Sequence, residues 1–123
     1  YVAVVGGARF SDKLKLLESL VTKADTIYVG GGVGHTLLAA RGGKVGRSMI
    51  EPDKVLVARG FLRRASERNV SVMLPRDLVA APGVRSDSGR VVAAGQVPED
   101  LAALDIGPET TQSWVDGLSR ART

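Results

Sequence analysis

The sequence VVGGARFSDK at residues 4–13 decides the fold, because it joins the end of a strand, a glycine turn and the start of a helix. The apolar run at residues 1–5 has the length and the β-branched content of a buried strand. Two glycines then break this run, at a point where the backbone can adopt a positive φ or lie close against a ligand. Ser11 is placed to cap the helix that follows, and Asp12 in the first turn complements the helix dipole. Such a strand, turn and helix make up half of a βαβ unit, in which loops at the carboxyl ends of the strands form the ligand crevice.

The same pattern occurs a second time before residue 45. Residues 26–29 form a short apolar run that predicts a buried strand, and Gly30, Gly31 and Gly32 follow it directly. The segment 36–41 then has the composition of a helix that ends at a glycine pair. Two junctions of this kind, side by side, would place two loops without side chains at one edge of a parallel sheet.

The rest of the chain alternates between predicted strands and helices, which is typical of a parallel α/β fold. A helix is predicted over residues 52–68 and another from 107–109 onward, and 90–94 predicts an edge strand. Because the chain starts inside a strand without an initiator methionine, we expect a fragment of a larger domain. The predicted fold is α/β: an incomplete, Rossmann-like, three-layer parallel sheet with helices on both faces and both glycine loops at one edge. Its parallel strands are expected at residues 1–5, 26–29, 70–74 and about 101–105, with a further short strand at 78–81.

The composition excludes several classes of site. The 123 residues suffice for one domain with a core, and 44% hydrophobic and 24% charged residues are ordinary for a globular protein. The absence of cysteine excludes disulfides and cysteine-ligated metals, and the single histidine, His35, excludes sites built from several histidines. No apolar run approaches the roughly 20 residues of a membrane-spanning helix. We therefore predict a cytoplasmic protein with no membrane partner and no metal site within these residues.

A net charge of +4 is compatible with a nucleic-acid partner. However, the cations are scattered, and the densest group shares a predicted helix face with Glu67, as expected for a solvated face. Aromatic residues, at 4%, offer few surfaces on which bases could stack. We predict no nucleic-acid partner, since the charge suits an anionic small molecule equally well. The cations of the dense group are Arg59, Arg63, Arg64 and Arg68.

The glycine loops match neither of the two best-known phosphate-binding motifs. No stretch fits the P-loop pattern, and the dinucleotide pattern G-x-G-x-x-G fails at the triple glycine. Taken alone, three glycines are as compatible with a tight strand–helix junction as with a binding loop. The first glycine pair differs, because the cations Arg9 and Lys13 follow it. A lysine is unfavourable near a helix N-terminus unless a bound phosphate offsets its charge, so we favour a phosphate site over a solvated surface lysine.

Five segments together carry a resemblance to a known family. In chain order they are GGARFSDK at residues 6–13, VGGG at 29–32, GRS at 46–48, LPRD at 74–77 and LDIGP at 104–108. Their order and spacing resemble those of phosphoglycerate kinase, and the resemblance extends along the whole chain. The chain is similar to the first part of that family's C-terminal, nucleotide-binding domain. The family's N-terminal domain, which holds the phosphoglycerate, would then be absent from residues 1–123.

The resemblance implies reversible phosphoryl transfer from 1,3-bisphosphoglycerate to ADP, giving 3-phosphoglycerate and ATP, with magnesium. It implies two catalytic residues: Arg9, in place of the family's usual lysine, stabilises the phosphoryl group in flight, and Lys13 binds the nucleotide phosphates. Such a transfer needs positioning and fixed positive charge rather than a nucleophilic side chain. The residues implied to bind ADP or ATP are Gly6, Gly7, Ala8, Lys13, Gly30, Gly31, Gly32, Met49, Ala103 and Leu104.

Two departures from the family pattern keep an alternative open. Arg9 presents a planar fork on a longer stem than lysine, and Ala103 stands where a glycine usually lets the backbone approach the ribose. A non-catalytic nucleotide-binding α/β module is therefore the alternative to an active kinase. The resemblance also implies that a central strand and the magnesium-binding aspartate follow Thr123. We accordingly expect the isolated chain to be inactive and the full-length protein to be a monomer.

Overall fold

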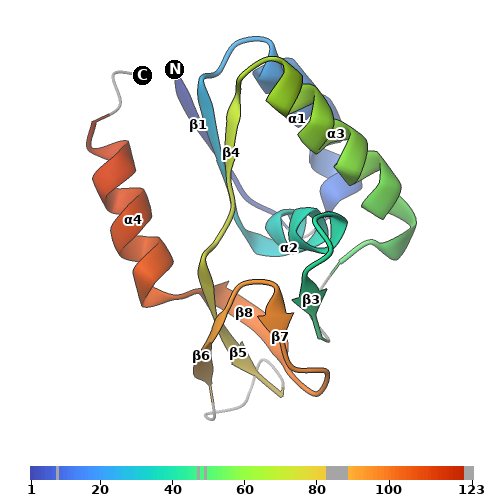
Figure 1. The fold of residues 1–123 in the computed structure, drawn as a ribbon, viewed down its shortest axis with the longest axis vertical. Coiled ribbons are helices and arrows are strands. Elements are labelled where there is room, and N and C mark those ends of the chain that lie inside the picture. The colour runs from blue at the N-terminus through green and yellow to red at the C-terminus, as the bar shows by residue number, and fades with distance from the viewer. Residues whose placement is uncertain (8, 47, 49, 83–88, 121–123) are drawn as a thin grey trace.

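A parallel three-stranded sheet forms one end of the computed structural model, which describes residues 1–7, 9–46, 48, 50–82 and 89–120. Its strands are β1 (Val2–Val5), β2 (Thr26–Val29) and β4 (Ser71–Met73), in the order β1-β2-β4 (Figure 1). The register pairs Val5 with Val29, so both strands end at the same edge of the sheet. The glycine loops that follow them therefore lie together, as predicted.

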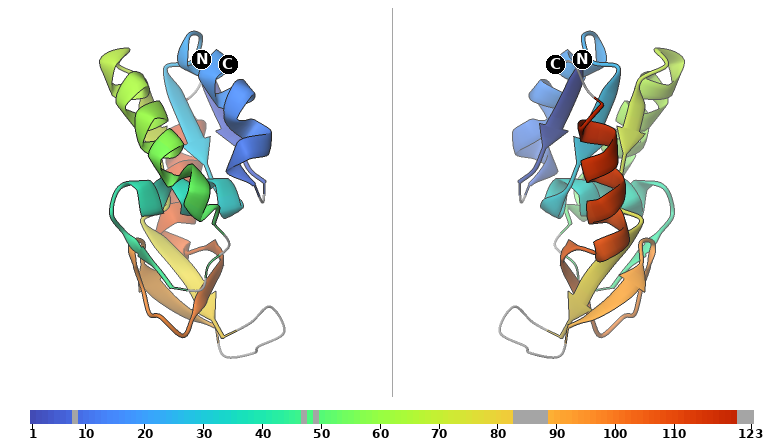
Figure 2. Two further views of the ribbon diagram at one scale, coloured as in Figure 1. Left: turned by 90° about the vertical axis from the view of Figure 1, so that its right-hand side faces the viewer. Right: turned by 90° about the vertical axis from the view of Figure 1, so that its left-hand side faces the viewer.

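Helices cover both faces of this sheet. On β2, Ile27 and Val29 point into the main core, whereas Tyr28 points to the opposite face and meets Trp114 edge to face, with ring centroids 5.4 Å apart. Figure 2 shows α4 on the side of the sheet opposite α1 and α3. The predicted three-layer α/β architecture is confirmed. The helices are α1 (Phe10–Val21), α2 (Gly31–Ala40), α3 (Val55–Glu67), preceded by the 3₁₀ turn Pro52–Lys54, and α4 (Pro108–Leu118). Over the described residues, none of them has both the length and the apolar character to cross a bilayer.

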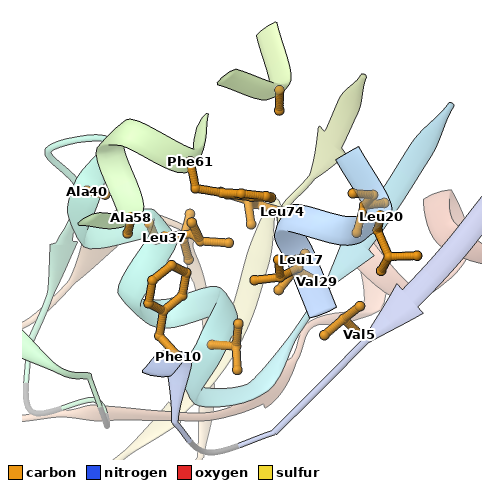
Figure 3. Packing of buried hydrophobic residues seen from close by; sticks show 14 of the residues in the cluster. Val5, Phe10, Leu17, Leu20, Val29, Leu37, Ala40, Ala58, Phe61 and Leu74 are labelled. Atoms are coloured by element: carbon orange, nitrogen blue, oxygen red, sulfur yellow. The ribbon is translucent and has the colours of Figure 1, made fainter. Parts of the chain in front are cut away.

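The main core lies between the sheet and the first three helices. Phe10 at the start of α1 and Phe61 of α3 are fully buried. Figure 3 shows both phenylalanines among the buried side chains of this core, together with Leu37 of α2 and Leu74 at the end of β4. Burial of each such side chain contributes about 1.5–3 kcal/mol. This packing fixes α1 and α2 against the strands that they follow, and so fixes the glycine loops between them.

A second, antiparallel sheet replaces the predicted fourth parallel strand. It consists of β5 (Asp77–Ala81), β6 (Arg90–Ala93) and β8 (Ala102–Ile106), in the order β6-β5-β8. The prediction of a parallel strand at 101–105 is wrong, whereas the edge strand at 90–94 is confirmed as β6. A parallel neighbour needs a crossover of a dozen or more residues, usually a helix, but strands occupy the chain between β4 and β8. The short strands β3 (Lys44–Val45) and β7 (Gln96–Val97) form a separate parallel pair.

Two predicted helix starts are also wrong, both because a distant group stabilises the start. The first helix begins at Phe10 with no side-chain cap, and the N–H of Ser11 donates to Glu51 Oε1 at 2.8 Å. Ser11 is thus capped by another residue instead of acting as the cap. The second helix begins at Gly31 and not at residue 36, because the carbonyl of Gly7 accepts the N–H of Val33 at 3.1 Å.

A buried carboxylate connects the two sheets through α4. Asp77, at the start of β5, accepts hydrogen bonds from the N–H of Glu109 at 3.0 Å and from the N–H of Thr110 at 2.7 Å. The hydroxyl of Thr110 donates to the same carboxylate at 2.6 Å. Asp77 therefore caps α4 from a distance and uses the positive end of the helix dipole. Burial, the largest influence, opposes ionisation, but the hydrogen bonds from Thr110 and Glu109 together outweigh it and lower the pKa of Asp77.

The Asp77 cap predicts a pH-dependent stability. Because the folded pKa lies below the ordinary value of 3.8, the stabilisation is complete above pH 3.8 and is lost as the pH falls through the folded pKa. In the full-length protein, Asp77→Asn is expected to lower the free energy of unfolding at pH 7 by about 1–3 kcal/mol. The deficit relative to wild type should shrink in denaturant titrations below pH 3.8. Asp116→Asn, at an exposed carboxylate on the same helix, is the control and should change stability by less than about 0.5 kcal/mol. A deficit that stays constant down to pH 2.5 would contradict the cap.

Candidate functional site

The two glycine loops are hydrogen-bonded to each other at the carboxyl ends of β1 and β2. The N–H of Gly30 donates to the carbonyl of Val5 at 3.0 Å, which extends the strand pairing by one residue. The carbonyl of Gly7 accepts the N–H of Val33 in the first turn of α2. The backbone at Gly6, Gly7 and Gly31 is exposed to solvent, so these contacts form a surface of main chain without side chains.

Gly31 is the closest contact between the loops. Its φ of +67° is a conformation that side-chain-bearing residues rarely adopt. A Cβ at this position would also lie 2.8 Å from the carbonyl oxygen of Gly7. Gly7 itself has a φ of +141°. Both loops therefore need glycine for backbone conformation, and Gly31 needs it for space as well.

Lys13 lies against the first glycine loop. A Cβ at Gly7 would be 3.1 Å from Cε of Lys13 and 3.8 Å from its Cγ. Gly7 has no side chain, and the side chain of Lys13 runs across the space that is left open there. The structure thus brings Lys13 together with the loop that precedes α1. That Lys13 points into a crevice shared by both glycine loops stays a prediction.

Arg9 stands immediately before α1, and two-thirds of its side chain is exposed. Its Nη2 lies 3.9 Å from Oε2 of Glu51, a residue that the sequence analysis did not select. The hydrogen bond from the Ser11 N–H lowers the pKa of Glu51, although burial acts to raise it. The positive charges of Arg9 and Lys54 also lower this pKa. Glu51 is thus held ionised at the start of α1. That Arg9 faces the glycine loops stays a prediction.

The arginines of α3 lie away from the loops, as predicted. Arg59 donates to the carbonyl of Ala40 at 3.3 Å. Arg64 pairs with Glu18 of α1 at 2.7 Å, and Arg63 is exposed on the same helix. These contacts explain the dense cation group as a helix surface.

The other residues predicted to bind the nucleotide are placed differently from one another. Ala103 is buried in the main core, and its N–H donates to Oγ of the buried Ser48 at 2.8 Å. Leu104, next along β8, is 41% exposed. The methyl group of Ala103 therefore packs inward, while Leu104 offers an apolar side chain to solvent. Two further predicted residues, Ala8 and Met49, lie outside the described residues.

Sequence reasoning missed the residues that support the loops from behind. Trp114 of α4 places its ring 3.8 Å from the position of a Cβ at Gly30. Ser48 fixes the start of β8, and Thr36 connects the second loop to Glu51 through hydrogen bonds. The bond between Ser48 and Ala103 spans 55 residues, so no local pattern could reveal it. The one available signal was the placement of Ser48 within the GRS segment.

The site combines main chain without side chains, an adjacent lysine and an exposed arginine. A flat or phosphorylated ligand can approach such a surface closely, because no side chains stand in the way. The two cations can neutralise the negative charge of the ligand.

Comparisons with known proteins agree along the whole chain. The family model described as "Phosphoglycerate kinase" matches residues 1–123. The chain belongs to the phosphoglycerate kinase family. Phosphoglycerate kinase from Moorella thermoacetica is 43% identical over 124 residues, and the one from Pelotomaculum thermopropionicum is 44% identical. Both matches include all of this chain but only 32% of each relative.

A solved phosphoglycerate kinase from Coxiella burnetii superposes with a TM-score of 0.95 at 36% identity, over 99% of this chain and 32% of that protein. The enzyme from Pyrococcus horikoshii, at 21% identity and a TM-score of 0.69 over 98% of this chain and 32% of that one, shares the fold. The chain thus spans about a third of the length of the phosphoglycerate kinases it matches.

Proposed function

We propose that residues 1–123 supply part of the ADP/ATP site of a phosphoglycerate kinase, as part of the nucleotide-binding domain of a two-domain protein. The whole protein would transfer a phosphoryl group between 1,3-bisphosphoglycerate and ADP, with 3-phosphoglycerate and ATP as products. One observation carries this proposal: Lys13 lies beside the first of two hydrogen-bonded glycine loops, in a chain that matches the family from end to end.

In the proposed mechanism, this chain binds and positions the nucleotide without forming a covalent intermediate. The exposed backbone of Gly6, Gly7 and Gly31 lets the nucleotide approach the sheet edge, and Lys13 pairs with its phosphates. Arg9 neutralises the negative charge that moves with the phosphoryl group. Fixed positive charge of this kind stabilises a phosphoryl-transfer transition state and needs no rearrangement during the reaction.

Magnesium, which the family assignment implies, would neutralise the nucleotide phosphates when bound. The cations Arg9 and Lys13 at this part of the site suit phosphate oxygens and would repel a divalent cation. The nearby carboxylate of Glu51 already accepts the N–H of Ser11 through Oε1 and faces Arg9 through Oε2. The residues described here therefore do not fit the role of metal ligands. We propose that an aspartate outside residues 1–123 holds the metal.

A coupled assay of ATP production on the full-length protein tests the proposed function. The full-length protein should turn over 1,3-bisphosphoglycerate and ADP, whereas the isolated chain 1–123 should not, because both substrates must be held in line. Tight ADP binding without turnover by the full-length protein would favour the non-catalytic module. Sustained turnover by the isolated chain would show that the division of the site proposed here is wrong.

Lys13→Ala in the full-length protein is expected to weaken ADP binding by about 1–3 kcal/mol, the range for loss of a charged hydrogen-bond partner. Isothermal titration with ADP measures this change. Lys15→Ala is the matched control, because Lys15 is an exposed lysine on the same helix. Equal dissociation constants for Lys13→Ala and wild type would identify Lys13 as a surface lysine.

The remaining partners follow from the same proposal. The phosphoglycerate substrates would bind through the domain outside this chain. We propose that the full-length protein is a cytoplasmic monomer that binds neither nucleic acid nor membranes. Size-exclusion chromatography with light scattering tests the oligomeric state directly.

A further inference from the structure

Glu51 connects the start of α1 to the second glycine loop. Its Oε1 accepts the N–H of Ser11 at 2.8 Å, and its own N–H donates to Oγ1 of Thr36 at 3.2 Å. The hydroxyl of Thr36 donates in turn to the carbonyl of Gly32 at 3.0 Å. One residue thus links two segments that carry proposed ligand-binding groups, across 40 residues of sequence on one side and 15 on the other.

The remaining carboxylate oxygen of Glu51 faces Arg9. The distance of 3.9 Å between Oε2 and Nη2 is longer than a hydrogen bond, so the pair attracts without occupying the donors of the guanidinium in a tight contact. The Glu51 side chain is 12% exposed, whereas that of Arg9 is 66% exposed. The fixed carboxylate of Glu51 therefore faces the solvent-accessible guanidinium of Arg9. The carboxylate can bias the direction of the Arg9 side chain, while the N–H donors of the guanidinium stay available to an anion.

We propose that Glu51 is a positioning residue, which holds Arg9 and the first turn of α1 in register with the second glycine loop. This inference rests on the proposed function, in which Arg9 meets the transferred phosphoryl group. Glu51 itself touches neither substrate. It acts through the direction of the Arg9 side chain, and small displacements of a charged group at a reacting centre have large effects on rate.

A double-mutant cycle in the full-length protein tests this role. Glu51→Gln keeps a carbonyl oxygen for the Ser11 N–H but removes the charge that faces Arg9. It is expected to lower kcat about tenfold and to leave KM for ADP and the melting temperature close to the wild-type values. In the Arg9→Ala background, Glu51→Gln should have no further effect on kcat. Glu18→Gln, which removes the carboxylate of the 2.7 Å pair with Arg64, is the matched control and should keep the wild-type kcat.

Two kinetic results would overturn the inference. One is a tenfold loss that persists in the Arg9→Ala background, and the other is a wild-type kcat for Glu51→Gln. A second measurement is independent of activity: in ¹⁵N NMR spectra, the Nε–H signal of Arg9, assigned with Arg9→Ala, should become more mobile in Glu51→Gln. An unchanged signal would refute positioning even in an active enzyme. An inactive wild-type protein with a mobilised Arg9 signal would instead refute the proposed function and retain the role of Glu51.

Discussion

Arg9→Ala in the full-length protein is expected to lower kcat for ATP formation by about 10³-fold, while KM for ADP changes less than threefold. A cation that meets the moving phosphoryl group acts mainly in the transition state, and an arginine in this role is worth on the order of 10³-fold or more in kcat in GTPases. Arg9 suits this role because it stands at the start of α1 with an exposed guanidinium. The measurement is steady-state kinetics with 1,3-bisphosphoglycerate and ADP.

Arg63→Ala is the matched control, because Arg63 is an exposed arginine on α3 within the helix-surface group. Its kcat should equal that of wild type. Arg9→Lys should recover most of the activity lost in Arg9→Ala, since it restores the positive charge with a different geometry. A kcat within threefold of wild type for Arg9→Ala would remove Arg9 from the mechanism.

Gly31→Ala in the full-length protein is expected to weaken ADP binding about 100-fold. The new Cβ would lie 2.8 Å from the carbonyl oxygen of Gly7, so the two loops must separate. Separation breaks the hydrogen bond from Val33 to Gly7 and leaves the first turn of α2 with an unpaired N–H, at a cost of about 1–3 kcal/mol. Isothermal titration with ADP gives the affinity, and thermal unfolding gives the stability.

Gly42→Ala separates backbone strain from steric overlap. Gly42 has a φ of +86°, and nothing lies within 4 Å of the position of its Cβ. Both alanine variants should lose about 1–2 kcal/mol of stability from the positive φ, but only Gly31→Ala should lose ADP affinity. Equal ADP affinities in the two variants would show that close approach of the glycine loops is unimportant for binding.

The positions of the three strands of the parallel sheet and of the glycine loops could be derived from the sequence. Residues 26–29 were predicted as a strand and are β2 with the same bounds. Such predictions succeed because a buried strand and a glycine junction leave local signals: apolar β-branched runs, and residues that permit a positive φ. The adjacency of the two loops followed as well, since parallel strands end at a common edge. The resemblance to the family rested on the same local segments.

Local signals could not distinguish the two kinds of sheet. The apolar run at β8 has the same pattern whether its neighbour is parallel or antiparallel, and the difference depends on the connection that precedes it. The starts of α1 and α2 also depend on groups that are distant in sequence, which local signals do not reveal. Ser11 is a residue type that favours the N-cap position of a helix. In the fold, however, the carboxylate of Glu51, 40 residues away, accepts the N–H of Ser11 at the start of α1.

The tertiary structure alone decided which carboxylates cap the starts of α1 and α4. Nothing in the sequence around Glu51 distinguishes it from the exposed acidic residues of the chain, and the LPRD segment that contains Asp77 gave no sign of a helix cap. Packing brings Glu51 to the start of α1 and Asp77 to the start of α4, where unpaired N–H groups and the helix dipole favour a negative charge. Both contacts join residues more than 30 positions apart, so they exist only after the core has brought the helices and strands together. The elements of this chain are therefore encoded locally, whereas the long-range contacts of these two carboxylates are a product of the fold.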